Sequence, residues 1–266
     1  MKFFKLLLKT LGVLVLLLAA LLASYLFYFS GSSHTPQNLH AAAGYRSPAG
    51  PILVFGGNRG TGLDIVRKLR ERGEDVTVAL RKTSQTEELR ALGVKTVIAD
   101  ALNADEVRAA FQAAPFVAVV STLGTSRGDN AKRPDWIGNR NVIDAARAAG
   151  VRRFVFVTVI GAGDSKATAP WPSSKFLAEV MELKTRAEDH LRASGLAYTI
   201  IRPGGLGNVK ETGTAVLAED PQAFSYISRA DLATLTVAAL GDARTEFKTY
   251  SAYDPSRKVI WKMFND

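Results

Sequence analysis

A glycine-rich turn between Gly56 and Gly62, with the sequence GGNRGTG, has the residue types and spacing that a phosphate-binding site requires. It follows the apolar run from Pro51 to Phe55 and leads directly into the amphipathic run from Leu63 to Leu69. Glycine adopts the backbone angles of a sharp turn and, having no side chain, lets the backbone approach a pyrophosphate closely. The N–H groups and the dipole at the start of the next helix favour an anion. Strand, glycine turn and helix in this order predict a dinucleotide-binding turn, and an ordinary glycine-rich turn is the alternative.

A cationic side chain follows the second strand-like run, Val76–Leu80. Arg81 stands where dinucleotide-binding folds meet the adenosine ribose, and neither Asp nor Glu occupies this position. An acidic residue would bind the ribose hydroxyls, whereas arginine suits a 2′-phosphate through charge-assisted hydrogen bonds. Arg59 in the glycine turn can add a second charge. The sequence therefore predicts NADP(H), with NAD(H) less favoured; solvated surface cations are the alternative.

Polar and small residues follow the next two strand-like runs. Asp100 can accept a hydrogen bond from the adenine amino group, with the N–H of Ala101 also in reach, and it could equally be a helix N-cap. The segment Ser121-Thr122-Leu123 begins with small residues, which lets the middle of a cofactor pass close to the backbone.

Three further residues could face the reacting end of a cofactor. The hydroxyl of Thr158 can bond a substrate carbonyl or the nicotinamide amide, unless this β-branched residue serves only strand packing. Lys184 lies in a mostly apolar helical stripe, from which it can reach the cofactor ribose or extend to water. Pro203 belongs to a rigid turn at the same edge of the sheet. The residues predicted to bind the cofactor are Gly56, Gly57, Asn58, Arg59, Gly60, Thr61, Gly62, Arg81, Asp100, Ala101, Ser121, Thr122, Leu123, Thr158, Lys184 and Pro203, with Thr158 and Lys184 also as the catalytic candidates.

Alternating strand-like and helical runs must position these residues. The expected strands are 52–55, 76–80, 96–99, 116–121, 154–158 and 198–201, and the expected helices include 61–72, 104–113, 137–149 and 174–193. This alternation predicts right-handed βαβ units, that is, a Rossmann-type doubly wound parallel sheet in three α/β/α layers. Ligands then bind outside the carboxyl ends of the strands. The residues between Gly161 and Pro172 form a candidate lid over that edge.

Composition excludes several classes of site. The chain has 266 residues, 47% of them hydrophobic, which suits one large domain. It has no cysteine and three histidines, so thiolate nucleophiles and a metal site are not expected. The net charge of +9 is spread along the chain, and we expect no nucleic-acid partner.

Residues 11–29 carry no charged side chain. A helix of this length spans about 28 Å, close to the hydrocarbon thickness of a bilayer. The sequence predicts one N-terminal transmembrane helix as a single-pass membrane anchor in residues 1–29, then a linker in 30–50 and the NAD(P)-binding domain in 51–266; a cleaved signal peptide is the alternative. Lysines before the span place the domain outside the cytoplasm, whereas nicotinamide cofactors are abundant in the cytoplasm, so the side of the membrane stays open.

Several segments together resemble the short-chain dehydrogenase/reductase superfamily, in its atypical NAD(P)-binding branch of NmrA-like and biliverdin-reductase-B-like proteins. The resemblance covers residues 51–253 and rests on the glycine turn, Arg81, and the segments 154–158, 194–204 and 228–232. The superfamily implies an NAD(P)-binding Rossmann fold. Its catalytic members carry a Tyr four residues before the helical Lys, and that position is Val180 here. The resemblance therefore implies either a membrane-anchored NADP(H)-dependent oxidoreductase acting on a small acceptor, or a redox sensor or scaffold that binds NADP(H) without turnover.

Overall fold

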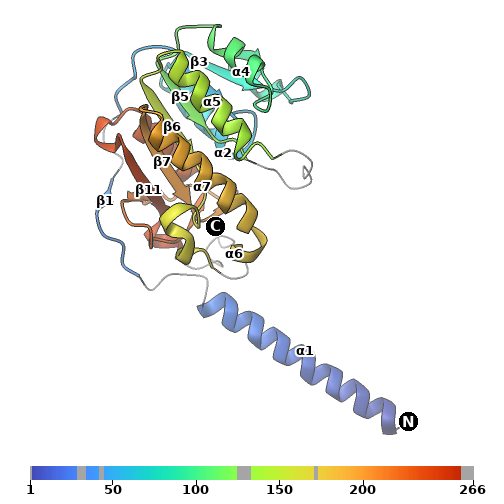
Figure 1. Cartoon of the computed structure of the whole chain (residues 1–266). Helices are drawn as coiled ribbons and strands as arrows, with labels where there is room; N and C mark the ends of the chain where they lie inside the picture. Colours follow the sequence, from blue (N-terminus) through green and yellow to red (C-terminus); the bar gives the residue numbers. More distant parts are fainter. Residues whose placement is uncertain (1, 29–33, 42–44, 125–132, 171–172, 259–266) are drawn as a thin grey trace.

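Short apolar runs, each followed by a turn and a helix, form a parallel sheet with helices on both faces (Figure 1). The computed structural model describes residues 2–28, 34–41, 45–124, 133–170 and 173–258. The strands are β1 Leu39–His40, β2 Ile52–Phe55, β3 Val76–Leu80, β4 Lys95–Ile98, β5 Ala118–Ser121, β6 Arg153–Val157, β7 Ala197–Pro203, β8 Gly205–Gly207, β9 Val216–Ala218, β10 Tyr226–Ser228 and β11 Lys248–Tyr253. The α-helices are α1 Lys2–Tyr28, α2 Gly60–Glu71, α3 Glu87–Ala91, α4 Ala104–Phe111, α5 Ile137–Ala148, α6 Ser173–Phe176, α7 Ala178–Ala193 and α8 Arg229–Leu240. Short 3₁₀ helices are η1 Gly163–Thr168, η2 Ala243–Thr245 and η3 Pro255–Arg257.

The main sheet has the strand order β1-β9-β11-β7-β6-β5-β2-β3-β4. All neighbours from β4 to β11 in this order pair in parallel, and β9 and β1 add an antiparallel edge. The chain runs outward from β2 through β3 to β4, then returns to β5 on the other side of β2. The order thus reverses between β2 and β5, and such a switch point leaves a crevice at the carboxyl ends of the strands. The predicted doubly wound three-layer fold is confirmed.

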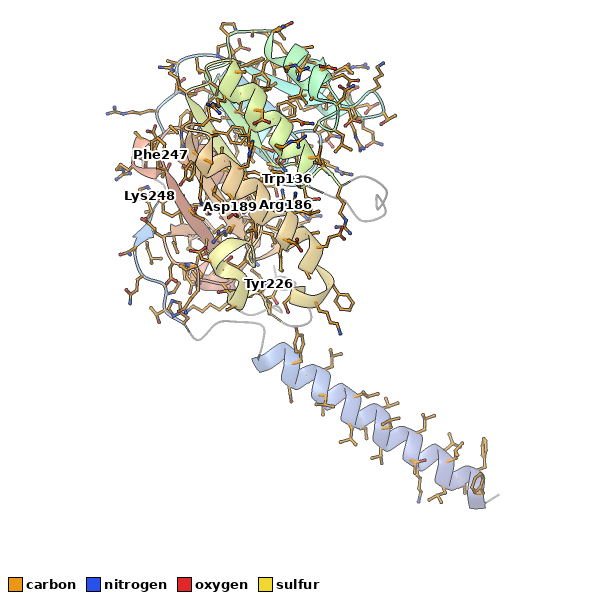
Figure 2. The ribbon with its side chains drawn as sticks, viewed as in Figure 1. Trp136, Arg186, Asp189, Tyr226, Phe247 and Lys248 are labelled. Carbon is orange, nitrogen blue, oxygen red and sulfur yellow. The ribbon has the colours of Figure 1, made fainter. Side chains whose placement is uncertain are left out.

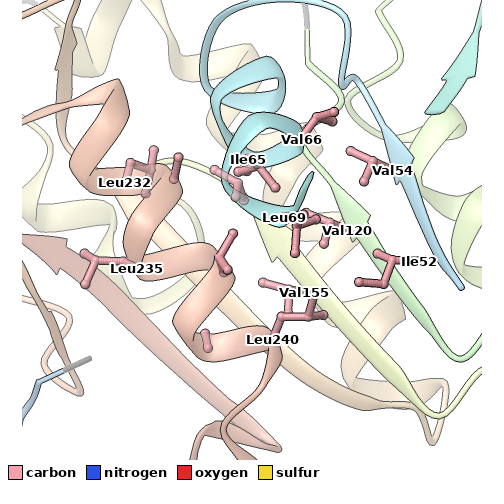
Figure 3. Packing of buried hydrophobic residues seen from close by; sticks show 14 of the residues in the cluster. Ile52, Val54, Ile65, Val66, Leu69, Val120, Val155, Leu232, Leu235 and Leu240 are labelled. Carbon is pink, nitrogen blue, oxygen red and sulfur yellow. The ribbon is translucent and has the colours of Figure 1, made fainter. Parts of the chain in front are cut away.

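Two apolar layers hold the helices against the sheet. On one face α2 and α8 pack together over β2, β5 and β6 through Ile65, Leu69 and Leu235, among others (Figure 3). On the other face α4, α5 and α7 bury residues such as Val107, Ile143 and Leu191. The central strands are buried throughout because helices cover both faces, which explains their unbroken apolar sequences.

Two predicted boundaries differ in the structure. The helix expected over 174–193 is divided into α6 and α7, because the backbone at Leu177 (φ −106°, ψ 9°) leaves the helical region. Part of the segment expected as a linker instead forms β1, which pairs with β9, while Tyr45 and Ser47 donate hydrogen bonds to Glu74. Residues 30–33 and 42–44 of that segment lie outside the described residues, as do 171–172 of the candidate lid.

The N-terminal helix α1 stands apart from the sheet (Figure 1). Its stretch Phe3–Tyr25 has a mean hydropathy of 2.6 and is not buried inside the protein. By length and composition it is one helix that could cross a bilayer, and a signal sequence would meet the same criteria.

Candidate functional site

A cleft of about 950 Å³ runs along the carboxyl ends of the parallel strands, across the switch point. All of the predicted cofactor-binding residues except Gly57 and Ser121 line it. Lining residues that the sequence did not single out include Thr83, Ser84, Gln85, Gly124, Asp135, Leu206, Asn208 and Arg229. The site residues therefore come together from strands and loops spread over most of the domain.

The glycine turn approaches its neighbours so closely that side chains are excluded. Gly56 has φ +80°, and a methyl group there would lie 2.6 Å from the Thr122 hydroxyl. A methyl group at Gly62 would lie 2.1 Å from the carbonyl oxygen of Gly56. In the described structure, no side chain caps the start of α2, because the N-cap residue Arg59 makes no side-chain capping bond. An open backbone cradle at a helix N-terminus fits a pyrophosphate.

Gly57 and Ser121 point away from the cleft. A methyl group at Gly57 would meet the side chains of Val54, Val66 and Val78 at 3.0 Å, so this glycine permits close packing of the turn on α2 and β3. Ser121 is fully buried and donates a hydrogen bond to Asn139 Oδ1 at 2.7 Å. Neither residue lines the cleft, and the cofactor contact expected from them stays a prediction.

An arginine from the late helix α8 covers the glycine turn. Arg229 donates from Nε to Asn208 Oδ1 at 2.8 Å, and its Nη1 lies 3.4 Å from Thr61 Oγ1. The same nitrogen is 3.8 Å from the position that a Cβ atom on Gly60 would occupy. The sequence analysis did not find this contact, because Thr61 and Arg229 are 168 positions apart and such a pair has no local signature.

One end of the cleft follows β3 and β4. Arg81 lies there, exposed to water, beside the loop of Thr83, Ser84 and Gln85. Asp100 accepts a hydrogen bond from the N–H of Leu102 at 3.0 Å. The alternative that Asp100 caps the next helix is wrong, because Asn103 is the N-cap of α4 and accepts from Asp105 and Glu106.

The other end of the cleft holds a buried ammonium group. Lys184 is only 4% exposed, so the alternative that it extends to water is wrong. Its Nζ donates a hydrogen bond to the carbonyl oxygen of Leu123, lies 3.9 Å from Asp135 Oδ1 and sits 4.9 Å from the ring centre of Phe156. Burial lowers the pKa of Lys184 from 10.5 to about 8, against the opposing effect of the carboxylates of Asp135 and Glu188.

Thr158 belongs to a buried ionic network at the same end. Its hydroxyl donates to Glu188 Oε1 at 2.8 Å, and Arg202 binds both carboxylate oxygens of Glu188, at 3.0 and 2.6 Å. Glu188 and Arg202 are 0% and 1% exposed. Because the one hydroxyl hydrogen of Thr158 is already used, the group faces the cleft as an acceptor rather than as the donor expected for a substrate carbonyl.

The residue in the position of the missing tyrosine is part of the cleft. Val180 lines it on α7, one helical turn before Lys184. The isopropyl group of Val180 cannot donate a proton. Of the Tyr–Lys pair that catalytic members of the superfamily carry, this chain has only the lysine, Lys184, whose ammonium group carries transferable protons.

Comparisons with known proteins agree with this geometry. A family described as NAD(P)H-binding matches residues 56–243. The anaerobilin reductase ChuY from Escherichia coli O157:H7 has a similar structure, with a TM-score of 0.70 and 31% identity, covering 79% of this chain and 100% of that one. The uncharacterised sugar epimerase YhfK of Bacillus subtilis is 31% identical over 75% of this chain and 92% of its own length. The NAD(P)H azoreductase of Xenophilus azovorans is 28% identical, covering 77% of this chain and 68% of its own.

Proposed function

We propose that this chain, which belongs to the NAD(P)H-binding family in the atypical branch of the short-chain dehydrogenases/reductases, is an NADP(H)-dependent reductase of a small acceptor, held at a membrane by α1. The observation that carries the proposal is the single cleft that joins the glycine turn, Arg81 and the buried Lys184. Relatives named as reductases of anaerobilin and of azo compounds support a reductase over a binding-only protein.

The residues of the cleft have separate tasks in this proposal. The backbone from Gly56 to Gly62 and the guanidinium of Arg229 hold the pyrophosphate, and Arg81 binds a 2′-phosphate. Lys184 bonds the nicotinamide-side ribose. When bound, the reduced nicotinamide supplies two electrons as a hydride.

The acceptor must also gain one proton, and no tyrosine is among the described residues that line the cleft. Thr158 is held by Glu188 and orients the acceptor or the cofactor amide without giving up its hydrogen. Lys184 fixes the ribose, and the proton comes from water entering the open cleft. Binding and orientation, rather than acid catalysis by a side chain, then account for the rate.

The second candidate function is an NADP(H) sensor or scaffold without turnover. Val180 in place of the catalytic tyrosine is the specific observation that favours it. The two functions share the same cofactor site, so only turnover separates them.

The deciding experiment uses the full chain reconstituted in lipid vesicles. We expect saturable fluorescence enhancement with NADPH and a loss of its absorbance when azo, quinone or bilin acceptors are added. NADPH binding without oxidation by any of these acceptors would support the sensor instead. No binding of either nucleotide would contradict both.

Replacing Arg81 by Asp should weaken NADPH binding about ten- to a hundredfold, because losing a charge-assisted bond costs about 1.5–3 kcal/mol. NADH affinity should not fall. Fluorescence titrations measure both constants. Lys82→Asp is the matched control, since it makes the same charge change at the neighbouring exposed residue, which does not line the cleft. Equal losses for NADPH and NADH in Arg81→Asp would argue against a 2′-phosphate contact.

A further inference from the structure

Two large apolar side chains project from the protein beside the cleft. Phe176 at the end of α6 is 81% exposed, and Leu177 after it is 40% exposed. A phenylalanine exposed to this degree gains nothing from burial within its own chain. We refer to these two residues as the α6 tip.

The covalent path from α1 restricts which face of the domain can meet a bilayer. Only residues 29–33 separate Tyr28 from His34, so even a fully extended chain spans at most about 20 Å. His34 is fixed on the domain, where its Nε2 lies 2.7 Å from Asp220 Oδ2, and β1 follows on the sheet edge. A domain of about 216 residues has a radius of gyration of about 17 Å, so it is wider than the tether is long. If α1 spans a bilayer, the face around Asp220 must lie near the lipid.

The α6 tip belongs to that face. Next to Asp220, the carbonyl oxygen of Pro221 accepts a hydrogen bond from Thr168 of η1 at 2.8 Å. The helix α6 begins five residues after Thr168. In Figure 1, α6 lies at the end of the domain nearest α1, while β3 and α4 lie at the opposite end.

The same face opens toward the cleft. Leu177 stands one helical turn before Val180, which lines the cleft on α7. Leu206, 36% exposed, lines it from β8. The neighbouring Gly205 is covered by the ring of Tyr226, and the pKa of Tyr226 is raised by burial and by the nearby Tyr25 of α1. Apolar side chains therefore stand both at the α6 tip and on the wall of the cleft.

The charge of the surface suits the headgroup region. Lys166 within η1 and Lys175 within α6 are exposed, and both precede the α6 tip in the sequence. Lysine beside an aromatic residue is typical of segments that rest in a membrane interface, because the ring enters the acyl boundary while the ammonium group meets anionic lipid.

We propose that the α6 tip rests in the lipid bilayer and that the cleft receives lipophilic small molecules from the bilayer past Leu177 and Leu206. This rests on the proposed function, in that α1 is a membrane anchor and the cleft is a reductase site. It narrows the acceptor to the class of molecules that dissolve in lipid. A second copy of this chain is the other occupant that could cover the α6 tip, and the experiment separates the two.

Because the chain has no cysteine, single fluorophores can be attached without background. Phe176→Cys reports on the α6 tip. Ile98→Cys is the matched control, since Ile98 is 48% exposed on β4, the sheet edge opposite β1. Phe247 (Figure 2) would not serve, because it lines a hollow together with Asp220 and Pro221, on the face that meets the bilayer. Both full-length proteins, labelled with an environment-sensitive dye, are reconstituted in phosphatidylcholine/phosphatidylglycerol vesicles containing a nitroxide-labelled lipid.

The expected result is a blue shift and strong quenching at position 176, with neither at position 98. Equal weak quenching at both positions would overturn the proposal. A shift at position 176 that grows with protein concentration, without lipid quenching, would assign the surface to a second copy and overturn it as well. Flotation of the vesicles reports whether the protein is anchored in the membrane. NADPH titration of the same samples reports whether the cofactor still binds.

Entry from the lipid is tested with a carbene-generating photoprobe dissolved in the bilayer. Mass spectrometry should find labels on peptides containing Val180 and Leu206 as well as on α1. The variant Phe176→Ser/Leu177→Ser should lower labelling of Leu206 several-fold and leave NADPH affinity unchanged. Labelling confined to α1 in the parent protein would overturn the entry route, even where NADPH binds normally.

Discussion

Replacing Glu188 by alanine should lower the free energy of unfolding by about 3–5 kcal/mol, because Arg202 loses its buried carboxylate partner and keeps only Asp164, which is 69% exposed. Arg202 is 1% exposed and binds both oxygens of Glu188, and Thr158 and Arg192 also donate to this carboxylate. The effect is measured by denaturant unfolding of the full chain in non-ionic detergent, followed by tryptophan fluorescence.

The neighbouring residue provides the control. Asp189 is 66% exposed and pairs with Arg192, which is 31% exposed, at 2.8 Å. Exposed pairs contribute little, so Asp189→Ala should change stability by less than about 1 kcal/mol. If both variants lost the same small amount, Glu188 and Arg202 would not be a buried pair in solution. Arg202→Met tests the same network from the other side, and it should cost less than Glu188→Ala, because Thr158 and Arg192 still donate to the carboxylate of Glu188.

The parts of the fold that the sequence predicted well are those with local signals. The glycine turn lies between a fully apolar strand and an amphipathic helix. Its glycines are required by the local sterics of a sharp turn, so they can be recognised in the sequence. Strands β2, β3 and β5 are mostly apolar because both faces are covered, so short apolar runs bounded by turn residues, rather than an alternating pattern, located them. Ser228 is a further local signal, since a serine before a helix is a favoured N-cap and its hydroxyl accepts from the N–H of Asp231 at 2.9 Å.

The parts that escaped prediction depend on partners distant in the chain. Strand β1 has two residues and exists because it pairs with β9, far away in sequence. Arg229 reaches the glycine turn only after α8 packs on α2. The predicted role of Thr158 as a donor was wrong for the same reason. The sequence suggested that its hydroxyl could donate to a ligand, but the hydroxyl donates its hydrogen bond to Glu188, thirty positions later in the chain.

The type and spacing of neighbouring residues can also be equally compatible with two different structures. Asp100 and Asn103 are both good helix caps within three residues, and the helix begins after the second of them. Ser121 is small enough to lie beneath a cofactor, but its buried bond to Asn139 shows that the hydroxyl serves the core. Only the direction of the side chain decides such cases, and sequence spacing does not determine it.

The buried lysine should make stability depend on alkaline pH. The pKa of Lys184 is about 8 in the folded protein because burial disfavours its charge, and 10.5 is its ordinary value. Below pH 8 the folded chain bears the full cost of the buried ammonium, and above 10.5 neither state is charged. Between these values the unfolded chain binds more protons, so the contribution of Lys184 to stability rises with pH, by about 3 kcal/mol in total.

Lys184→Met removes this titration and keeps the volume beside Phe156. The free energy of unfolding of the parent minus that of Lys184→Met should therefore rise from pH 8 to pH 10.5. Lys175 is exposed, so the difference between the parent and Lys175→Met should not change over this range. Denaturant unfolding at several pH values measures both differences. A constant difference for Lys184→Met would mean that the ammonium is solvated. A difference that rises with pH would mean that the buried charge of Lys184 destabilises the folded protein. A destabilising charge at the reacting end of the cleft is expected where the residue serves ligand binding rather than folding.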